Sequence, residues 1–251
     1  MKFGIIGFGR FGKLWSNALL PYGEVLIYDK QNILNDEMNK FQVATLEKIV
    51  KVDILFLMVP ISEFENCCHA IKDLIDKNTL VVDCCSVKVH TASVMKRVFQ
   101  EGQATLPTHP LFGPDSVKRQ GLKGQKMVIC ENKNMNQNEI QFKHILHQMG
   151  LKLLITTASE HDKQMAHSQS LVHFIGRGLK ALNLHHQELA TPDFEALINI
   201  NHMVVHDTWQ LFLDMHRYNP YAKSIREKFI DQLSLLDDEI NVEKEKINAN
   251  D

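Results

Sequence analysis

The sequence predicts an α/β domain followed by an all-helical domain. Between residue 2 and about residue 156, short runs of aliphatic and β-branched residues alternate with longer helical stretches. This alternation is typical of a parallel sheet with crossover helices. After Thr157 the strand signals stop, and the chain continues as helices to about Lys246. We therefore expect residues 1–156 to form the α/β domain and residues 157–251 to form the helical one.

Seven runs supply the expected strands of the first domain. They are KFGIIG (2–7), EVLIYD (24–29), DILFLMVP (53–60), TLVVDC (79–84), ATLPTHP (104–110), KMVIC (126–130) and LKLLIT (151–156). The runs are almost continuously apolar, as expected of strands that helices cover on both faces. Because ligands of such sheets bind at the carboxyl ends of the strands, we expect the functional residues there.

The second domain is expected to mediate self-association. Its helices are interrupted at residues 183–186, 191–192 and 219–220. The segment from Phe194 to Met215 is apolar around much of its circumference. A helix with one solvent-exposed face would need fewer apolar positions. Burial in a subunit interface would explain this pattern, so we expect a homodimer. The charged tail NVEKEKINAND is expected to fray.

Composition and charge exclude several classes of protein. Of the 251 residues, 44% are apolar and 23% are charged, which excludes a disordered, collagen-like or disulfide-scaffold protein. The 28 basic and 30 acidic side chains leave a net charge of -2, too small to attract nucleic acid or anionic lipid. Five cysteines without zinc-site spacing indicate free thiols in a reducing compartment. Since the N-terminus carries neither a signal-peptide pattern nor a membrane span, we expect a cytoplasmic protein.

A glycine motif follows the first expected strand and precedes a helix. It has the form GxGxxG and consists of Gly7, Phe8, Gly9, Arg10, Phe11 and Gly12. The first glycine permits a tight turn, the second lets the backbone approach a pyrophosphate, and the third allows close packing of helix on strand. In this context the motif predicts a Rossmann-type dinucleotide-binding domain.

The cofactor is expected to be NAD. Asp29 ends the second expected strand, where a carboxylate accepts hydrogen bonds from the hydroxyls of the adenosine ribose and repels a 2′-phosphate. Lys30 is adjacent and would soften this preference for NAD over NADP. A solvated aspartate at a strand end is the alternative interpretation of Asp29. Pro60, at the end of the third run, is also assigned to the cofactor site.

One histidine stands at the end of an expected strand. His109 lies in LPTHPLFGPDS, where prolines and a glycine fix the loop that follows. Histidine is well suited to accept a proton near neutral pH, and this loop would hold it over a nicotinamide. Ser86 and Lys88 follow the preceding strand and are expected to face the same crevice. A serine there is also an ordinary helix cap, and a lysine an ordinary solvated charge.

The helical domain carries a polar stripe. Gln169, His173 and Arg177 follow one another at i, i+4 steps and therefore share a helix face. If the stripe faces a cleft it would bind an anion, and if it faces water it is an ordinary wet face. His202 and His206 form an HxxxH pair, but no acidic third ligand supports a metal site, so no metal is expected.

These motifs, in this order, resemble the prephenate dehydrogenase family, and most of all the dehydrogenase part of bifunctional chorismate mutase-prephenate dehydrogenases. The resemblance covers nearly the whole chain. It is carried by GFGRFG, DCCSVK, THPLFGPDS and EHDKQMAHSQSLVHF. Because no chorismate mutase helix precedes Met1, we expect a monofunctional form.

The resemblance implies an NAD-dependent oxidative decarboxylation of prephenate to 4-hydroxyphenylpyruvate, a step of tyrosine biosynthesis. His109 matches the catalytic histidine of the family, which assists deprotonation of the ring hydroxyl, and Ser86 matches the serine that orients it. His173 matches the histidine of the substrate-binding helix, and His161 the histidine that opens that helix.

One position departs from the family pattern. After a Ser/Thr-Pro pair the family carries an arginine that clamps a substrate carboxylate, whereas Thr191-Pro192 is followed here by Glu195. Four explanations stay open. Another cation takes over the role, with Arg177 or Lys88 as the candidates; or the ungapped alignment with the family is displaced at this position; or the substrate is arogenate; or the substrate site has decayed and the protein is a nucleotide-binding regulator. A β-hydroxyacid dehydrogenase, a further alternative, fits the HPLFGP loop poorly.

Overall fold

The structure, a computed structural model, describes residues 1–31, 40–130 and 136–248, without the side chains of residues 201–203, 205 and 243–248. The chain forms two compact units, Met1–Asp162 and Lys163–Asp251. The first contains the whole sheet and the second is helical. Among the described residues, no helix combines the length and the apolar character that crossing a membrane requires.

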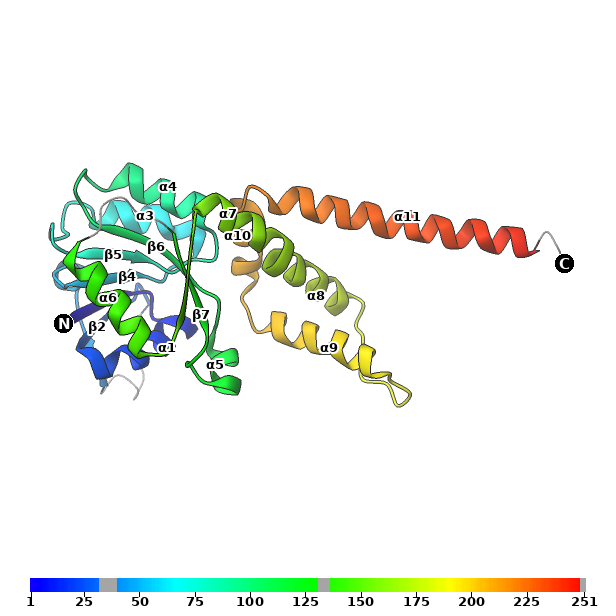
Figure 1. Cartoon of the computed structure of the whole chain (residues 1–251), viewed down its shortest axis with the longest axis horizontal. Coiled ribbons are helices and arrows are strands. Elements are labelled where there is room, and N and C mark those ends of the chain that lie inside the picture. Colours follow the sequence, from blue (N-terminus) through cyan, green and yellow to red (C-terminus); the bar gives the residue numbers. More distant parts are fainter. Residues whose placement is uncertain (32–39, 131–135, 249–251) are drawn as a thin grey trace. The chain divides into compact units, whose positions relative to one another are not determined.

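The first unit is built on an eight-stranded sheet (Figure 1). Its strand order is β3-β2-β1-β4-β5-β6-β7-β8. The strands are β1 (Lys2–Ile6), β2 (Glu24–Tyr28), β3 (Gln42–Val43), β4 (Ile54–Leu57), β5 (Leu80–Asp83), β6 (Thr105–Pro110), β7 (Lys126–Cys130) and β8 (Lys152–Thr156). The order reverses between β1 and β4, which is the position where open α/β sheets bind their ligands.

Helices cover both faces of this sheet. They are α1 (Arg10–Leu19), α2 (Leu46–Ile49), α3 (Ile61–Ile71), α4 (Lys88–Val98), α5 (Pro114–Gln120) and α6 (Gln137–Gln148), with the 3-10 turn η1 (Leu20–Tyr22) after α1. The ring of Phe56 in β4 contacts both Trp15 of α1 and Phe142 of α6, so these two helices share one face. Helices α3 and α4 pack on the opposite face (Figure 1). The aromatic contacts fix the core beneath the glycine loop.

All seven expected strands form, and three features differ from the expectation. β3 is an additional two-residue strand, too short to show a pattern in the sequence. β7 pairs with β6 in the antiparallel sense, so a wholly parallel sheet was wrong. The connection between them carries only the seven-residue α5, shorter than the helices between the parallel neighbours. Finally, β8 is an edge strand with Leu154 41% and Ile155 56% exposed, so its two faces are not both covered.

The second unit consists of helices (Figure 1). Helix α7 (Ala158–Met165), which begins in the first unit and ends in the second, leads into the π-helical turn η3 (Ala166–Ser170), followed by α8 (Leu171–Ala181), α9 (Pro192–Val205), α10 (Trp209–Tyr218) and α11 (Ala222–Asn248). Helices α8 and α9 approach closely at Gly176, where a Cβ atom would lie 2.3 Å from Cγ2 of Val204. A glycine is therefore required at this crossing.

One expectation about the helical region was wrong. The apolar segment from Phe194 to Met215 is two helices, because α9 ends at Val205 and Thr208 caps α10 by accepting a hydrogen bond from the Leu211 amide at 3.1 Å. The charged tail is helical from residue 241 to Asn248, where α11 ends, and its fraying stays a prediction. Its i, i+4 charges are compatible with an exposed helix.

Candidate active site

The glycine loop is closed against the sheet on one side and open on the other. Gly7 has a φ of +101°, and a Cβ there would lie 2.3 Å from the carbonyl oxygen of Met58. A Cβ on Gly12 would lie 2.1 Å from the carbonyl oxygen of Gly7. At Gly9 a Cβ would meet nothing within 4 Å. Only glycine fits the first two positions, whereas the backbone at Gly9 is accessible to a ligand.

Asp29 joins the end of β2 to this loop. Its Oδ2 accepts a hydrogen bond from the amide of Phe8 at 2.7 Å, and its Oδ1 accepts one from the amide of Gln31 at 2.9 Å. An ionised carboxylate has about four lone-pair positions, so each oxygen retains acceptor capacity for a further donor such as a ribose hydroxyl. The neighbouring Lys30 is held by Glu63, with Nζ 3.2 Å from Oε2.

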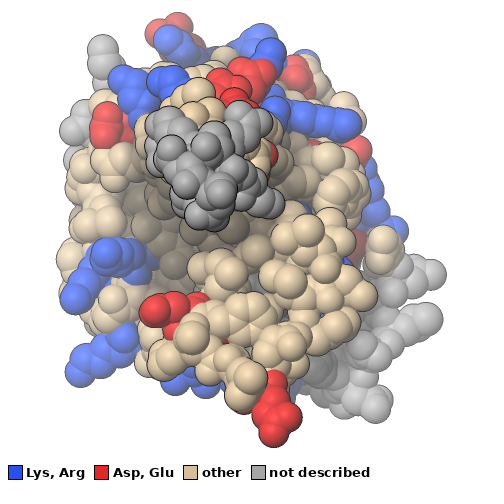
Figure 2. Space-filling view, turned by 90° about the vertical axis from the view of Figure 1, so that its right-hand side faces the viewer, with Lys and Arg blue, Asp and Glu red and all other residues tan. Residues whose placement is uncertain are grey.

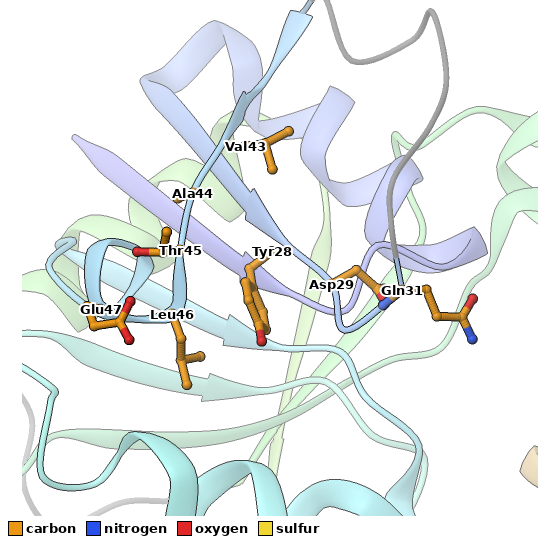
Figure 3. A pocket seen from close by; sticks show the side chains of 8 residues that line it. All are labelled: Tyr28, Asp29, Gln31, Val43, Ala44, Thr45, Leu46 and Glu47. Atoms are coloured by element: carbon orange, nitrogen blue, oxygen red, sulfur yellow. The ribbon is translucent and has the colours of Figure 1, made fainter.

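A hollow of about 460 Å³ opens beside Asp29 (Figure 3). It is lined by Tyr28, Asp29, Gln31, Val43, Ala44, Thr45, Leu46 and Glu47. The lining mixes apolar side chains with hydrogen-bonding groups and belongs to the ends of β2 and β3 and the start of α2. Such a surface can receive a flat heteroaromatic ring with a polar substituent.

The other residues assigned to the cofactor site have varied surroundings. The ring of Phe8 is buried in the core, and that of Phe11 stacks on Trp15 with centroids 5.9 Å apart. Arg10 pairs with Asp115 at 2.8 Å, which ties the glycine loop to the start of α5. Pro60 is exposed and immediately precedes α3. The two aromatic side chains therefore stabilise the loop from below.

The sheet register brings Ser86 and His109 to the same edge. In the parallel pair of β5 and β6, Asp83 lies opposite Pro107. Ser86 is three residues beyond the first of these positions, and His109 two residues beyond the second. Ser86 is half-buried in the turn before α4. The expected proximity of this serine and this histidine to one sheet edge thus follows from the strand pairing.

His109 is buried and belongs to a chain of polar side chains. It is 3% exposed, and its Nδ1 lies 2.9 Å from Nε2 of His161. Nδ1 of His161 lies in turn 2.7 Å from Oδ1 of Asp162. Burial, reinforced by the adjacent His161 and by the ammonium of Lys88, holds the pKa of His109 well below its ordinary value of 6.5. The ring is therefore uncharged at neutral pH and can accept a proton.

Asp162 also holds the N-terminus of α4. Its Oδ1 accepts a hydrogen bond from the amide of Lys88 at 2.7 Å, and its Oδ2 accepts one from the amide of Val89 at 2.8 Å. These amides have no partner within the helix, and a carboxylate at this end is favoured by the helix dipole. Asp162 is fully buried, so its charge is stabilised by these donors.

Lys88 does not present its ammonium group as the expected substrate contact. The side chain is fully buried, its Nζ forms an ion pair with Asp83, and it donates a further hydrogen bond to the carbonyl oxygen of Thr108 at 2.6 Å. Asp83 also accepts a hydrogen bond from the Thr91 hydroxyl at 2.6 Å. The physical reason is that a buried carboxylate at the end of β5 requires a cation.

In the second unit, His173 and Arg177 meet at Asp207. Nε2 of His173 lies 3.6 Å from Oδ2 of Asp207, and Arg177 donates to the backbone carbonyl of the same residue at 2.5 Å. Burial lowers the pKa of His173. The guanidinium of Arg177 also lies over the rings of Trp209 and Phe212, with centroid distances of 5.5 and 5.8 Å. Nδ1 of His173 and Nε of Arg177 are buried without a hydrogen-bond partner among the described residues.

Gln169 and Glu195 complete the residues singled out from the sequence. Gln169 is half-buried and lies in the π-helical turn η3, so the regular helical spacing assumed between it and His173 is interrupted. Glu195 lies in the first turn of α9, with Oε1 2.7 Å from Nδ1 of His186. Arg177 is bound to the backbone carbonyl of Asp207.

The described part of the chain contains no group of three histidine, cysteine, aspartate or glutamate side chains able to hold a metal ion. The side chain of His202, one half of the HxxxH pair, lies outside the described residues. All five cysteines are free. Burial raises the pKa of the Cys130 thiol to about 11, which makes this group unreactive at neutral pH.

Sequence reasoning missed the roles of Asp83 and Asp162. Both are fully buried carboxylates that organise the surroundings of His109. The available signal was the adjacent His161-Asp162 pair at the start of a helix. Its significance depends on a contact with residues more than 70 positions away in the chain, since Asp162 and Lys88 are separated by 74.

Comparison with known proteins identifies related sequences. The family model described as "Prephenate dehydrogenase, nucleotide-binding domain" matches residues 21–155, and the one described as "TYRAAT1-like, C-terminal domain" matches residues 178–250. A probable arogenate/prephenate dehydrogenase of Methanocaldococcus jannaschii is 30% identical over 205 residues, which cover 77% of this chain and 45% of that protein. Arogenate dehydrogenase 1, chloroplastic, of Arabidopsis thaliana is 25% identical over 248 residues, which cover 91% of this chain and 37% of that protein. The chain thus spans less than half the length of these two relatives.

Solved structures share the fold. Prephenate dehydrogenase from A. aeolicus, in complex with hydroxyphenyl propionate and NAD+, superposes with a TM-score of 0.74 at 17% identity, covering 98% of this chain and 92% of that chain. Synechocystis arogenate dehydrogenase gives a TM-score of 0.71 at 16% identity, and the superposition covers 97% of this chain and 93% of that chain. At these identities the likeness concerns the fold.

The buried ion pair gives a direct test of what Lys88 does. Lys88→Met leaves the Asp83 carboxylate without its cation, so we expect a loss of about 3–5 kcal/mol in the free energy of unfolding, measured with denaturant. The matched control is Lys96→Met on the exposed side of the same helix, expected to change stability by less than about 0.5 kcal/mol. A stable Lys88→Met protein with a raised Michaelis constant would restore Lys88 as a substrate contact.

Proposed function

The chain belongs to the prephenate dehydrogenase family, and on that premise we propose that it is an NAD-dependent enzyme that oxidatively decarboxylates prephenate to 4-hydroxyphenylpyruvate. The observation that carries this proposal is the buried, uncharged His109 at the sheet edge that also holds Ser86. The family match covers residues 21–155 and begins after the glycine loop. The loop geometry therefore supports cofactor binding independently.

The residues present fit NAD. The accessible backbone at Gly9 and the N-terminus of α1 would receive the pyrophosphate. The remaining acceptor positions of Asp29 would bind the ribose hydroxyls, and the hollow beside it would take the adenine. Lys30 is engaged by Glu63, which weakens its ability to attract a 2′-phosphate. These features favour NAD over NADP.

His109 is the proposed catalytic base. When bound, NAD supplies the hydride acceptor for the ring carbon that bears the hydroxyl. His109 accepts the hydroxyl proton, and the ring carboxylate leaves as carbon dioxide while the ring becomes aromatic. A positioned base of this kind contributes about 10²–10⁴-fold to a rate. Ser86 is proposed to orient His109 and the substrate.

The second unit is proposed to bind the substrate carboxylates. His173 and Arg177 share a helix face, and each has a buried nitrogen without a hydrogen-bond partner among the described residues. Such a nitrogen is costly unless a ligand or water satisfies it. We assign Gln169 to the same binding surface. Arg177 would bind a carboxylate through the guanidinium nitrogens that Asp207 does not engage.

Arogenate is the second candidate substrate. The carboxylate of Glu195 stands where the family resemblance leads one to expect an arginine, and its side chain is 40% exposed. A carboxylate favours a substrate with an ammonium group, which arogenate carries and prephenate lacks. The comparisons include arogenate dehydrogenases, so both substrates belong in the assay.

We also propose that the protein is a homodimer. Helix α11 exposes six large apolar side chains, each between 45% and 66% exposed: Ile230, Leu233, Leu235, Leu236, Ile240 and Val242. A second copy of the chain would bury them. On the face shown in Figure 2, basic and acidic side chains are scattered around a broad uncharged area, which does not favour nucleic acid as the partner. Five free thiols fit a reducing compartment such as the cytoplasm.

Turnover tests the catalytic assignment. With NAD, we expect NADH formation from prephenate to exceed that from arogenate, and His109→Asn to lower turnover with prephenate by at least about 10²-fold while NAD binding persists. The exposed His147 provides the control, because His147→Asn should leave turnover unchanged. Faster turnover of arogenate would select the second candidate, and full activity of His109→Asn would refute the assigned base.

Asp29 allows the cofactor preference to be separated from loop stability. Asp29→Asn retains an oxygen that can accept from the Phe8 amide but lacks the charge, so we expect weaker discrimination against NADP with the loop intact. Asp29→Ala loses both the acceptor oxygen and the negative charge, so it should also weaken NAD binding, measured by fluorescence titration. If the unaltered protein already prefers NADP, the role given to Asp29 is wrong.

Light scattering tests self-association. At micromolar concentration we expect the mass of a dimer, and Leu233→Glu on α11 should shift the protein toward monomer by burying a charge in the interface. Ser234→Glu places the same charge one residue further along the exposed helix as a control. A monomeric unaltered protein would contradict the proposed dimer.

A further inference from the structure

Three buried side chains of the first unit form a hydrogen-bonded chain that ends on a helix. The chain runs from His109 in β6 through His161 to Asp162, both in α7, and from Asp162 to the amides of Lys88 and Val89 at the start of α4. His109 and His161 are each 3% exposed and Asp162 is fully buried. The two imidazole rings meet edge to face, with an interplanar angle of 73°. Such a chain fixes where the protons lie.

Asp162 determines the protonated nitrogen of His161. An ionised carboxylate only accepts hydrogen bonds, so Nδ1 of His161, 2.7 Å from Oδ1, must carry a proton. The carboxylate is also bound by two backbone amides at the positive end of α4. Because these amides already stabilise its charge, Asp162 does not require a positively charged histidine. In the neutral ring with its proton on Nδ1, Nε2 of His161 is an acceptor.

His161 in turn determines the protonated nitrogen of His109. An acceptor at Nε2 of His161, 2.9 Å away, requires a proton on Nδ1 of His109. We propose that His161 and Asp162 are positioning residues that hold His109 with its proton on Nδ1 and its acceptor lone pair on Nε2. This inference rests on the proposed function, in which His109 accepts the hydroxyl proton.

The proton balance of the reaction is consistent with this arrangement. The O–H bond of the substrate breaks and an N–H bond forms at Nε2 of His109, which becomes a cation. Its Nδ1 proton stays in the hydrogen bond to His161, whose own Nδ1 proton stays on the bond to Asp162. The carboxylate thus stabilises the developing charge through the intervening ring. With the opposite arrangement, Nε2 of His109 would already carry a proton and could not act as a base.

The surrounding charges favour a neutral His109 before the reaction. The groups that face it are His161 of α7 and, at the start of α4, the ammonium of Lys88, which is paired with Asp83 of β5. A second cation beside Lys88 in this buried space would be unfavourable. The pair of Lys88 and Asp83 is distinct from the chain through Asp162, so the two buried carboxylates have separate tasks.

Nitrogen-15 NMR of the full chain tests the proton positions without any substrate. In protein labelled on its histidine nitrogens at pH 7.5, the His109 signals are assigned by their loss in His109→Asn. We expect Nδ1 of His109 to have the shift of a protonated nitrogen and Nε2 that of an unprotonated one. A proton on Nε2, or a cationic His109 ring, would overturn the inference.

Two variants of His161 separate positioning from mere support of the fold. In His161→Gln, the amide can donate to Asp162 and accept from His109, so the proton stays on Nδ1 of His109 and we expect the turnover number to fall by less than about tenfold. In His161→Leu neither bond exists, and we expect a fall of about 10²-fold or more with the Michaelis constants nearly unchanged. Equal losses in both variants, or a loss that follows thermal unfolding, would contradict a positioning role.

The outcomes distinguish this inference from the proposed function. If the NMR signals place the proton on Nδ1 of His109 but neither prephenate nor arogenate is oxidised, the proposed function fails and the proton arrangement stands. If a substrate is oxidised but the proton lies on Nε2, the proposed function stands and the positioning role of His161 and Asp162 fails.

Discussion

The buried carboxylate of Asp162 is the interaction on which the arrangement of the site depends. It binds the first two amides of α4 and the ring of His161, and so joins the end of the first unit to the turn that follows β5. A buried charge is tolerated only with such partners. Ser86 lies in the turn just before those amides, and His109 is bound to the same histidine. Both residues are thereby fixed relative to one another.

A second buried carboxylate, Asp83, organises the other side of the same turn. Its ion pair with Lys88, and the bond from Lys88 to the Thr108 carbonyl, tie the end of β5 to β6 directly before His109. Lys88 therefore makes two separate contacts: its backbone amide donates a hydrogen bond to Asp162, and its ammonium group forms an ion pair with Asp83. The rigidity that a catalytic base requires comes from these two groups of hydrogen bonds together with the parallel pairing of β5 and β6.

Local patterns predicted the parts of the fold that depend on local chemistry. The apolar runs became strands, and the glycines at positions 7 and 12 are required by atoms that a side chain would meet. The direction of β7 and the buried state of Lys88 depend on tertiary contacts, of β7 with β6 and of Lys88 with Asp83 and Thr108, which single-sequence patterns do not contain. The break between α9 and α10 was missed for a local reason, since the polar stretch 206–208 that contains the N-cap Thr208 is short and apolar residues dominate on both sides of it. Which residues of the second unit contact substrate stays a prediction.

The most direct test of His109 as a base is the dependence of kcat/KM for prephenate on pH. Burial, together with the adjacent His161 and the ammonium of Lys88, holds the pKa of His109 well below 6.5, and the uncharged ring is the active form. Activity is therefore fully present at neutral pH and is lost only as the pH falls through this lowered pKa. We expect kcat/KM to remain constant from pH 7.5 through 6.5 and to decline at more acidic pH. A decline centred at or above 6.5 would contradict a buried His109 as the proton acceptor.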